Sequence, residues 1–366
     1  MTNAEPESGF SILPTTSHTK VTAGEVTGFG AEFSPAAASA RYSASTGGWG
    51  ALRSHPLGDL AISPAAMVFH YGQAIFEGLK AFRSDNGSIG VFRPDRNAER
   101  FQRSAQRIAM PELPVDVFVD AVMGVVRESA ALVPPTRSGS LYLRPFMIAT
   151  EPRLGSRPSH EYLFMVLASP VGDLFDQGGR GIRVRLSGAT PRAFPGGTGA
   201  AKCAGNYAAA QATYGQAAAE GFDQVVWLDA IDHRYVEELS GMNVFLVRRT
   251  EVGDELITPP LTDTLLAGVT RESVIDLGTE LGLTVREVPI AWDWWRDEAL
   301  QGRVTEAFAC GTAAGVTAIG SVTSSEGSWT MADGGIGPVT RRLRELLRDI
   351  QYGAVDAHRE WIFPVV

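Results

Sequence analysis

The stretch GGTGAAKCAGNY, residues 196–207, surrounds one lysine, Lys202, with glycines and other small residues. From Pro195 to Gly221 the only charged residues are Lys202 and Glu220. Glycines allow a backbone to approach a ligand closely, and a lysine amine that burial keeps neutral forms a Schiff base with an aldehyde. Lys202 is therefore either an ordinary exposed loop lysine or the amine of a site for an aldehyde cofactor such as pyridoxal phosphate.

Lysine is scarce elsewhere in the chain. It occurs only at Lys20, Lys80 and Lys202, and the other 29 basic residues are arginines. An arginine supplies positive charge as well as a lysine does, but its guanidinium stays protonated and does not act as an amine nucleophile. Each of the three lysines is therefore a candidate for lysine chemistry.

Composition limits the class of protein. The chain has 366 residues, of which 44% are hydrophobic and 20% charged, so it has material for about two globular domains. The formal net charge of −9 argues against a nucleic-acid binder. No apolar run reaches the ~18 residues of a membrane helix, and Met1 to Ser8 lacks the features of a targeting signal. With only Cys203 and Cys310 no disulfide framework is expected, and we expect a cytoplasmic protein without membrane or nucleic-acid partners.

Strand and helix patterns alternate along the whole chain, which predicts two mixed α/β or α+β domains. Hydrophobic periodicity predicts helices at 95–109, 116–132, 206–220, 270–281, 292–300 and 339–350. It predicts strands at 140–150, 161–169, 182–186, 223–228 and 244–248. Asp95 is the expected cap of the first helix. The glycine-rich segment 172–181 is the predicted linker between a small N-terminal α/β domain, 1–171, and a large C-terminal domain, 182–366.

Common catalytic motifs are absent from the sequence. No phosphate-binding loop of the GxxxxGK[ST] type and no GxSxG nucleophile elbow occurs. Gly197-Thr198-Gly199 begins like a dinucleotide fingerprint, but Lys202 stands where that pattern needs a small residue, so a nicotinamide oxidoreductase is a weak alternative. The six histidines never pair at i,i+4, so no metal site is expected.

Several spaced blocks together resemble the branched-chain amino-acid aminotransferases, which are pyridoxal-phosphate enzymes of fold type IV. The resemblance runs from about Phe29 to the terminal EWIFPV, with blocks FHYGQAIFEGLKAFR (69–83), VFRPDRNAERFQRSA (91–105), LYLRP (141–145), TEPRLG (150–155), GNY (205–207), EELSGMN (237–243), TPPLTDTLLAGVTRES (258–273) and FACGTAAGV (308–316). It implies a two-domain fold with the cofactor at the domain interface, the C-terminal domain being the one that binds pyridoxal 5′-phosphate.

The resemblance also implies which residues bind the cofactor. Lys202 is the Schiff-base lysine and the base that moves the proton. Glu238, rather than its neighbour Glu237, faces the pyridine nitrogen and keeps it protonated. Tyr207 binds the phenolic oxygen. Arg100 binds the phosphate, although from the pattern alone it belongs to a stripe of helix arginines that are usually solvated. The other implied phosphate contacts are Val269, Thr270 and Thr312.

For the substrate, the resemblance implies an apolar pocket with two polar features. The implied pocket residues are Phe29, Tyr71, Phe76, Tyr142 and Leu154. Arg144 shares a strand face with Tyr142 and helps the pocket accept the distal carboxylate of glutamate. Gly241 and Ala313 bring backbone near the substrate carboxylate. On residue type alone, each apolar member is more readily explained as part of a hydrophobic core than as a ligand contact.

The implied reaction is transamination between leucine, isoleucine or valine and 2-oxoglutarate, giving the branched 2-oxo acid and glutamate, in branched-chain amino-acid biosynthesis or degradation. The alternatives with the same fold are an aminodeoxychorismate lyase and a D-amino-acid aminotransferase. A non-catalytic binding protein is disfavoured because Lys202 and Glu238 are both present. The resemblance further implies a homodimer in which Tyr71 and Leu154 close the neighbouring subunit's site.

Overall fold

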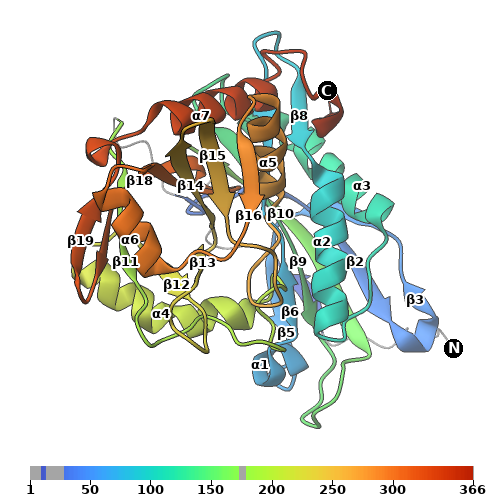
Figure 1. Cartoon of the computed structure of the whole chain (residues 1–366). Helices are drawn as coiled ribbons and strands as arrows, with labels where there is room; N and C mark the ends of the chain where they lie inside the picture. Colours follow the sequence, from blue (N-terminus) through green and yellow to red (C-terminus); the bar gives the residue numbers. More distant parts are fainter. Residues whose placement is uncertain (1–9, 14–28, 173–178, 366) are drawn as a thin grey trace, which may run out of the picture. The chain divides into compact units, whose positions relative to one another are not determined.

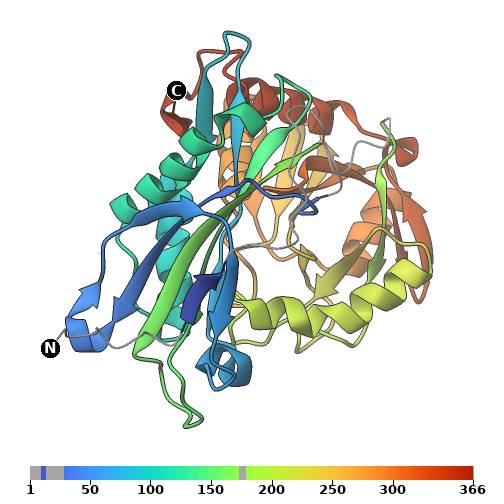
Figure 2. The same cartoon turned by 180° about the vertical axis from the view of Figure 1, so that it is seen from behind.

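The chain forms two compact units, each built around a nine-stranded sheet (Figures 1 and 2). The computed structural model describes residues 10–13, 29–172 and 179–365. The first unit contains Met1–Gly172, Ala201–Gly205 and His358–Val366, and the second contains Asp173–Ala200 and Asn206–Ala357. Most of the predicted linker, residues 173–178, lies outside the described residues. No helix in the described ranges has the length and apolar character to cross a membrane.

The sheet of the first unit is antiparallel, and it carries most of this unit's core. Its strands in spatial order are β20 (Ile362–Pro364), β8 (Ile89–Phe92), β7 (Leu79–Arg83), β9 (Ser140–Ala149), β10 (Glu161–Val171), β2 (Ala36–Ser43) and β3 (Gly48–Trp49). In addition β4 (Arg53–Pro56) pairs with β2, and β6 (Ala74–Phe76) pairs with β9. A separate two-stranded sheet joins β1 (Phe10–Leu13) to β5 (Asp59–Ile62).

Two helices, α2 (Pro94–Arg107) and α3 (Val115–Glu128), pack together against the first sheet (Figure 1). The apolar run of β10 is buried on both of its faces: Phe164 belongs to the core with Phe101 and Phe118, while Leu163 belongs to a smaller cluster. This explains why β10 reads as a continuous apolar run rather than an alternating one. The short helix α1 (Met67–Tyr71) precedes β6.

The second unit has parallel and antiparallel pairs in one sheet. Its strands in spatial order are β13 (Val236–Leu239), β12 (Gln224–Leu228), β11 (Ile182–Leu186), β18 (Gly315–Ser324), β17 (Val304–Gly311), β14 (Asn243–Thr250), β15 (Gly253–Thr258) and β16 (Thr284–Glu287), and β19 (Gly327–Thr330) pairs with β18. Its helices are α4 (Ala204–Ala219), α5 (Val269–Glu280), α6 (Trp292–Leu300) and α7 (Pro338–Gln351). The mixed α/β class predicted from the sequence is confirmed.

The structure corrects two details of the predicted helices. Asp95 does not cap α2: the cap position is Arg93, whose φ of 45° is left-handed, and Pro94 opens the helix with Asp95 inside the first turn. The helix predicted to reach residue 132 ends at Glu128 and is followed by a 3₁₀ turn, Ala130–Leu132. Proline at the first helical position explains the earlier start of α2, because it has no N–H that needs a helical partner.

Candidate active site

The backbone of Lys202 is anchored within the first unit. The Lys202 amide donates to Ser104 Oγ of α2 at 2.9 Å, and the Lys202 carbonyl accepts from the Phe76 amide at 3.0 Å. The next residue, Cys203, forms a β-bridge with Ile75 of β6. The lysine is therefore held by a helix and a strand that lie about 100 residues earlier in the chain.

A buried ion pair lies beside Lys202. Glu77 is fully buried, and its two carboxylate oxygens accept from Arg100 Nε and Nη2, both at 2.7 Å. Burial by itself raises the pKa of Glu77, but the charge and hydrogen bonds of Arg100, with the charge of Lys202, hold that pKa below its usual value. Arg100 is thus separated from the other arginines of α2, since Arg96 pairs with Glu99 at the surface.

Aromatic side chains and an arginine gather around Lys202. Its Nζ lies 4.9 Å from the ring centroid of Phe76, and the guanidinium carbon of Arg144 lies 4.7 Å from the same centroid. Arg144 Nη2 donates to the Tyr142 hydroxyl at 3.1 Å, which places these two side chains on one face of β9 as expected. The Phe29 and Tyr142 rings meet edge to face at 4.8 Å. The structure therefore brings together five of the residues predicted for the site.

The tightest contact of this wall involves a glycine. A Cβ built on Gly78, directly after Glu77, would lie 2.1 Å from the Tyr142 hydroxyl oxygen. Real Cβ atoms do not approach an atom so closely, so Tyr142 could not keep its position beside any other residue at 78. The glycine of the EGLK block is therefore required by the position of Tyr142 in the predicted substrate pocket.

Tyr71 and Leu154, the two residues predicted to act across a dimer, form a separate exposed pair. The Tyr71 hydroxyl donates to the Leu154 carbonyl. Their side chains are 41% and 66% exposed, and the neighbouring Phe69 is 61% exposed. Exposed large apolar side chains are typical of an interaction surface where they form a contiguous patch.

In the second unit, Glu238 of β13 is buried and held at two points. Arg192 Nε lies 3.0 Å from Glu238 Oε1, and the Leu266 amide donates to Glu238 Oε2 at 3.0 Å. Arg192 in turn donates from Nη2 to the carbonyls of Gly199 and Thr264. A buried carboxylate with an arginine partner remains an anion, which suits a group that faces a protonated ring nitrogen.

The adjacent Glu237 has a different environment. It accepts a hydrogen bond from the Thr264 hydroxyl, and its Oε2 is buried without a partner among the described residues. Burial raises the pKa of Glu237 above its usual value, while Thr264 and Arg192 partly oppose that shift. The protonated form of Glu237 is therefore favoured more than in a free glutamate, whereas Glu238 has the direct arginine contact.

The start of α5 suits an anion. The helix begins at Val269 after Gly268, and its cap residue provides no side-chain hydrogen bond. Helix N-terminal amides point outward and attract phosphate. A Cβ built on Gly268 would lie 2.1 Å from Asn243 Oδ1, so glycine is needed where the chain enters the helix. Thr270 is buried in the first turn.

Three further predicted residues lie near these elements. Tyr207 lies in the first half of α4, and a Cβ built on Gly241 would lie 3.8 Å from its ring. Thr312 and Ala313 form the turn between β17 and β18. Gly311, just before that turn, approaches the Gly241 carbonyl, because a Cβ built on Gly311 would lie 3.2 Å from that oxygen.

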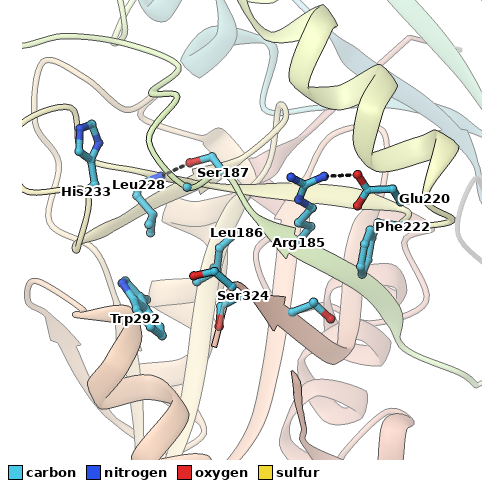
Figure 3. Close-up of a pocket in the computed structure, with 12 residues that line it drawn as sticks. Arg185, Leu186, Ser187, Glu220, Phe222, Leu228, His233, Trp292 and Ser324 are labelled. Atoms are coloured by element: carbon cyan, nitrogen blue, oxygen red, sulfur yellow. Dashed lines mark hydrogen bonds and ion pairs between the residues drawn. The ribbon is translucent and has the colours of Figure 1, made fainter. Parts of the chain in front are cut away.

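The second unit also has a cavity of about 410 Å³ that contains none of the predicted site residues (Figure 3). An ion pair between Arg185 and Glu220, 2.7 Å long, lies on one side of it, and Trp292 and His233 lie on the other. Ser187 Oγ accepts from the Leu228 amide within its wall.

Sequence reasoning did not assign a role to Glu77 or Arg192. Glu77 stands in the block FHYGQAIFEGLKAFR, whereas Arg192 lies outside the quoted blocks. Their partners are 23 and 46 residues away, so only the fold pairs them. A glutamate that follows the apolar strand AIF was the available signal for Glu77.

Comparison with known proteins identifies the family. The family model described as amino-transferase class IV matches residues 74–322. The chain is 48% identical over 316 residues to the branched-chain-amino-acid aminotransferase of Mycolicibacterium smegmatis, covering 86% of each chain. It is 42% identical to branched-chain-amino-acid transaminase 1 of Bacillus subtilis, over 87% of this chain and 88% of the relative.

The chain belongs to the class IV branched-chain aminotransferases. Solved structures of such enzymes agree with this assignment. The enzyme of Thermoproteus uzoniensis with norvaline has a TM-score of 0.71 and 28% identity, over 86% of this chain and 97% of that one. The holo form of the Thermobaculum terrenum enzyme has a TM-score of 0.71 and 26% identity, over 89% and 98%.

The cofactor of this aminotransferase is pyridoxal 5′-phosphate. The described residues fit that group. They include a lysine amine, a buried arginine for phosphate, a helix N-terminus without a side-chain cap, and a buried carboxylate beside an arginine. These are the donors and acceptors that an aldehyde, a phosphate and a pyridinium nitrogen require.

Proposed function

We propose that this aminotransferase exchanges the amino group between leucine, isoleucine or valine and 2-oxoglutarate, with Lys202 as its reactive amine. The observation that carries the proposal is the cluster around Lys202, where Phe76 contacts both the Lys202 amine and the Arg144 guanidinium. The cofactor, when bound, supplies an electron sink for the carbanion formed at the substrate Cα. The lysine Nζ would move the proton between the substrate Cα and C4′, the aldehyde carbon of the cofactor, which is the transfer that transamination requires.

The remaining cofactor roles follow from charge and position. Arg100 and the Val269 and Thr270 amides bind the phosphate, with the Thr312 hydroxyl as a further donor. Glu238 faces the pyridine nitrogen, and Tyr207 binds the phenolic oxygen. The Arg192 contact keeps Glu238 anionic, so that the ring nitrogen keeps its proton.

Two kinds of substrate side chain share one pocket in this proposal. Phe29, Phe76 and Tyr142 provide apolar surface for a branched aliphatic chain, and Arg144 binds the distal carboxylate of glutamate. The edge-to-face contact and the Arg144–Tyr142 hydrogen bond hold these groups in place. Gly241 and Ala313 offer backbone to the substrate carboxylate.

The test compares two lysines. Lys202→Ala is expected to abolish transamination and the visible absorbance of bound cofactor, whereas Lys80→Arg keeps both. A Lys202→Ala enzyme with wild-type absorbance would refute the assignment. A panel of L-leucine, L-isoleucine, L-valine, D-alanine and aminodeoxychorismate separates the branched-chain reaction from those of the two related enzyme classes.

We also propose a homodimer in which Tyr71 and Leu154 complete the partner's site, because both side chains are exposed and the Tyr71 hydroxyl donates to the Leu154 carbonyl. Mixing the inactive variants Lys202→Ala and Tyr71→Ala should restore part of the activity when subunits exchange. No recovery despite demonstrated exchange, or a fully active monomer, would contradict the shared site. The two buried free thiols, Cys203 and Cys310, support a cytoplasmic location, where thiols stay reduced.

A further inference from the structure

Glu77 is the most deeply buried acid beside the proposed cofactor residues, and no role has been given to it so far. Its side chain has no exposed surface, and that of Arg100 is 5% exposed. Removing a carboxylate from water is costly unless it is paired and its oxygens accept hydrogen bonds. Glu77 meets this requirement, since Asn97 Nδ2 donates to Oε2 at 2.7 Å and the Gly78 amide donates to the same oxygen at 3.2 Å.

The pair with Arg100 fixes an orientation as well as a distance. Nε and Nη2 bind one carboxylate oxygen each, and such two-point pairing holds the guanidinium plane in line with the carboxylate. Asn97 lies one turn before Arg100 on α2, so the same helix face supplies both partners of Glu77. Ser104, one turn after Arg100, donates to the Arg100 carbonyl and accepts from the Lys202 amide.

Two other arginines of α2, Arg96 and Arg103, pair with an exposed acid instead. Arg96 and Arg103 share Glu99 at 2.6 and 3.9 Å, and their side chains are 36% and 55% exposed. Exposed pairs of this kind hold a side chain weakly. Of these arginines, Arg100 is the one whose guanidinium is set by a buried acid.

We propose that Glu77 is a positioning residue for the phosphate end of the cofactor site, holding the Arg100 guanidinium in the orientation that binds phosphate. This inference rests on the proposed function, in which Arg100 binds the phosphate and Lys202 the aldehyde. The negative charge of Glu77 also acts in the opposite direction, because a carboxylate beside Arg100 weakens the attraction of that guanidinium for the phosphate. The two effects predict opposite changes when the negative charge is removed.

The experiment measures binding of pyridoxal 5′-phosphate, pyridoxal and inorganic phosphate to the full-length apoenzyme. Pyridoxal has the aldehyde and ring but no phosphate, so the ratio of the two cofactor affinities reports on the phosphate end alone. Glu77→Gln should weaken pyridoxal 5′-phosphate roughly 10- to 100-fold, as expected for the loss of a charge-assisted hydrogen-bonded pair. It should change pyridoxal binding by less than about 3-fold.

Two further variants keep the inference falsifiable. Glu77→Asp retains the charge but is one methylene shorter, and it should lose part of the phosphate selectivity even if Glu77→Gln does not fold. The matched control is Glu99→Gln, which removes the exposed acid of the same helix and should leave all three affinities within about 2-fold of wild type.

The outcomes separate this inference from the proposed function. Unchanged or tighter binding of pyridoxal 5′-phosphate by a folded Glu77 variant would overturn the positioning role, as would an equal loss for pyridoxal, which indicates a structural role only. Arg100→Ala serves as the reference. If Arg100→Ala weakens pyridoxal 5′-phosphate and the Glu77 variants do not, only the Glu77 inference fails. If Arg100→Ala also has no effect, the phosphate role of Arg100 fails together with it.

Discussion

Replacing Arg192 by methionine tests the charge arrangement in the second unit most directly. The substitution keeps an unbranched chain of similar reach but removes the cation 3.0 Å from Glu238. Glu237 and Glu238 are both buried, and both would lose the positive charge of Arg192. One of the two carboxyls is expected to take up a proton, because two neighbouring buried carboxylates without a cation repel each other.

The expected loss of stability follows from burial. The side chains of Arg192 and Glu238 are 7% and 4% exposed, and removing one partner of such a pair destabilises a protein by about 3–5 kcal/mol. This range already includes the cost of losing the hydrogen bonds to the Gly199 and Thr264 carbonyls, because Arg192 donates those as well. If Glu238 takes up the proton, the ring nitrogen loses its anionic partner, and we expect kcat to fall roughly 100-fold.

The measurement is urea unfolding of the apoenzyme together with kcat of the cofactor-saturated enzyme. Arg234→Met is the matched control, because Arg234 likewise pairs with a carboxylate, with two nitrogens 3.0 and 3.2 Å from Asp293, but its side chain is 53% exposed. The control should lose less than about 1 kcal/mol and keep its activity. Equal effects of the two substitutions, or an Arg192→Met enzyme with wild-type kcat, would refute the reasoning.

Four other substitutions test the pKa shifts of two glutamates and the packing at Gly78. The hydrogen bonds of Arg303 lower the pKa of Glu298 to about 2. The stability that ionised Glu298 contributes is therefore complete above its unfolded-state pKa near 4.5 and is lost as pH falls toward 2. Glu298→Gln should lower the free energy of unfolding at pH 7 by about 1–3 kcal/mol and flatten this loss at acid pH, measured by urea unfolding. Burial raises the pKa of Glu237, so the folded protein holds this proton more tightly than the unfolded chain and its stability falls as pH rises above 4.5. Glu237→Gln should remove this decline. A variant whose stability falls with pH as steeply as that of wild type would contradict the assignment to Glu237. Gly78→Ala should lower the free energy of unfolding by about 1–3 kcal/mol and raise the KM for glutamate. Adding Tyr142→Phe to this variant should recover part of the lost stability, because it removes the oxygen nearest the new methyl group. Additive stability losses in the double-mutant cycle would argue against the contact.

Much of the secondary structure was predictable where periodicity was strong. Strand β11 and helix α6 begin and end at the predicted residues. Strand β2 was not predicted, since AAASA begins it and alanine favours helix over strand. Its pairing with β10 and β4 determines its conformation, and such long-range pairing has no local signal.

The candidate site was predictable as a set of residues but not as a set of contacts. The family blocks pointed to Arg100 among the arginines of its helix, while the reason for its burial, Glu77, lies across the fold. Likewise no pattern near residue 202 indicated that this segment is held by Ser104 and Phe76. These contacts join residues about 100 positions apart, and local propensity carries no information at that range.

The path of the chain through the two units has a consequence for synthesis on the ribosome. The first sheet gains its edge strand β20 from the far end of the chain, where Ile362 pairs with Phe92 of β8. At about 5–20 residues per second, the nascent chain emerges for roughly 10–40 s after Gly172 before that strand is made. Throughout this interval the β8 edge has no strand to cover it, and an open edge recruits other chains. Strand β20 therefore closes this edge only late in synthesis, and a chain cut after Ala357 would keep the edge open permanently.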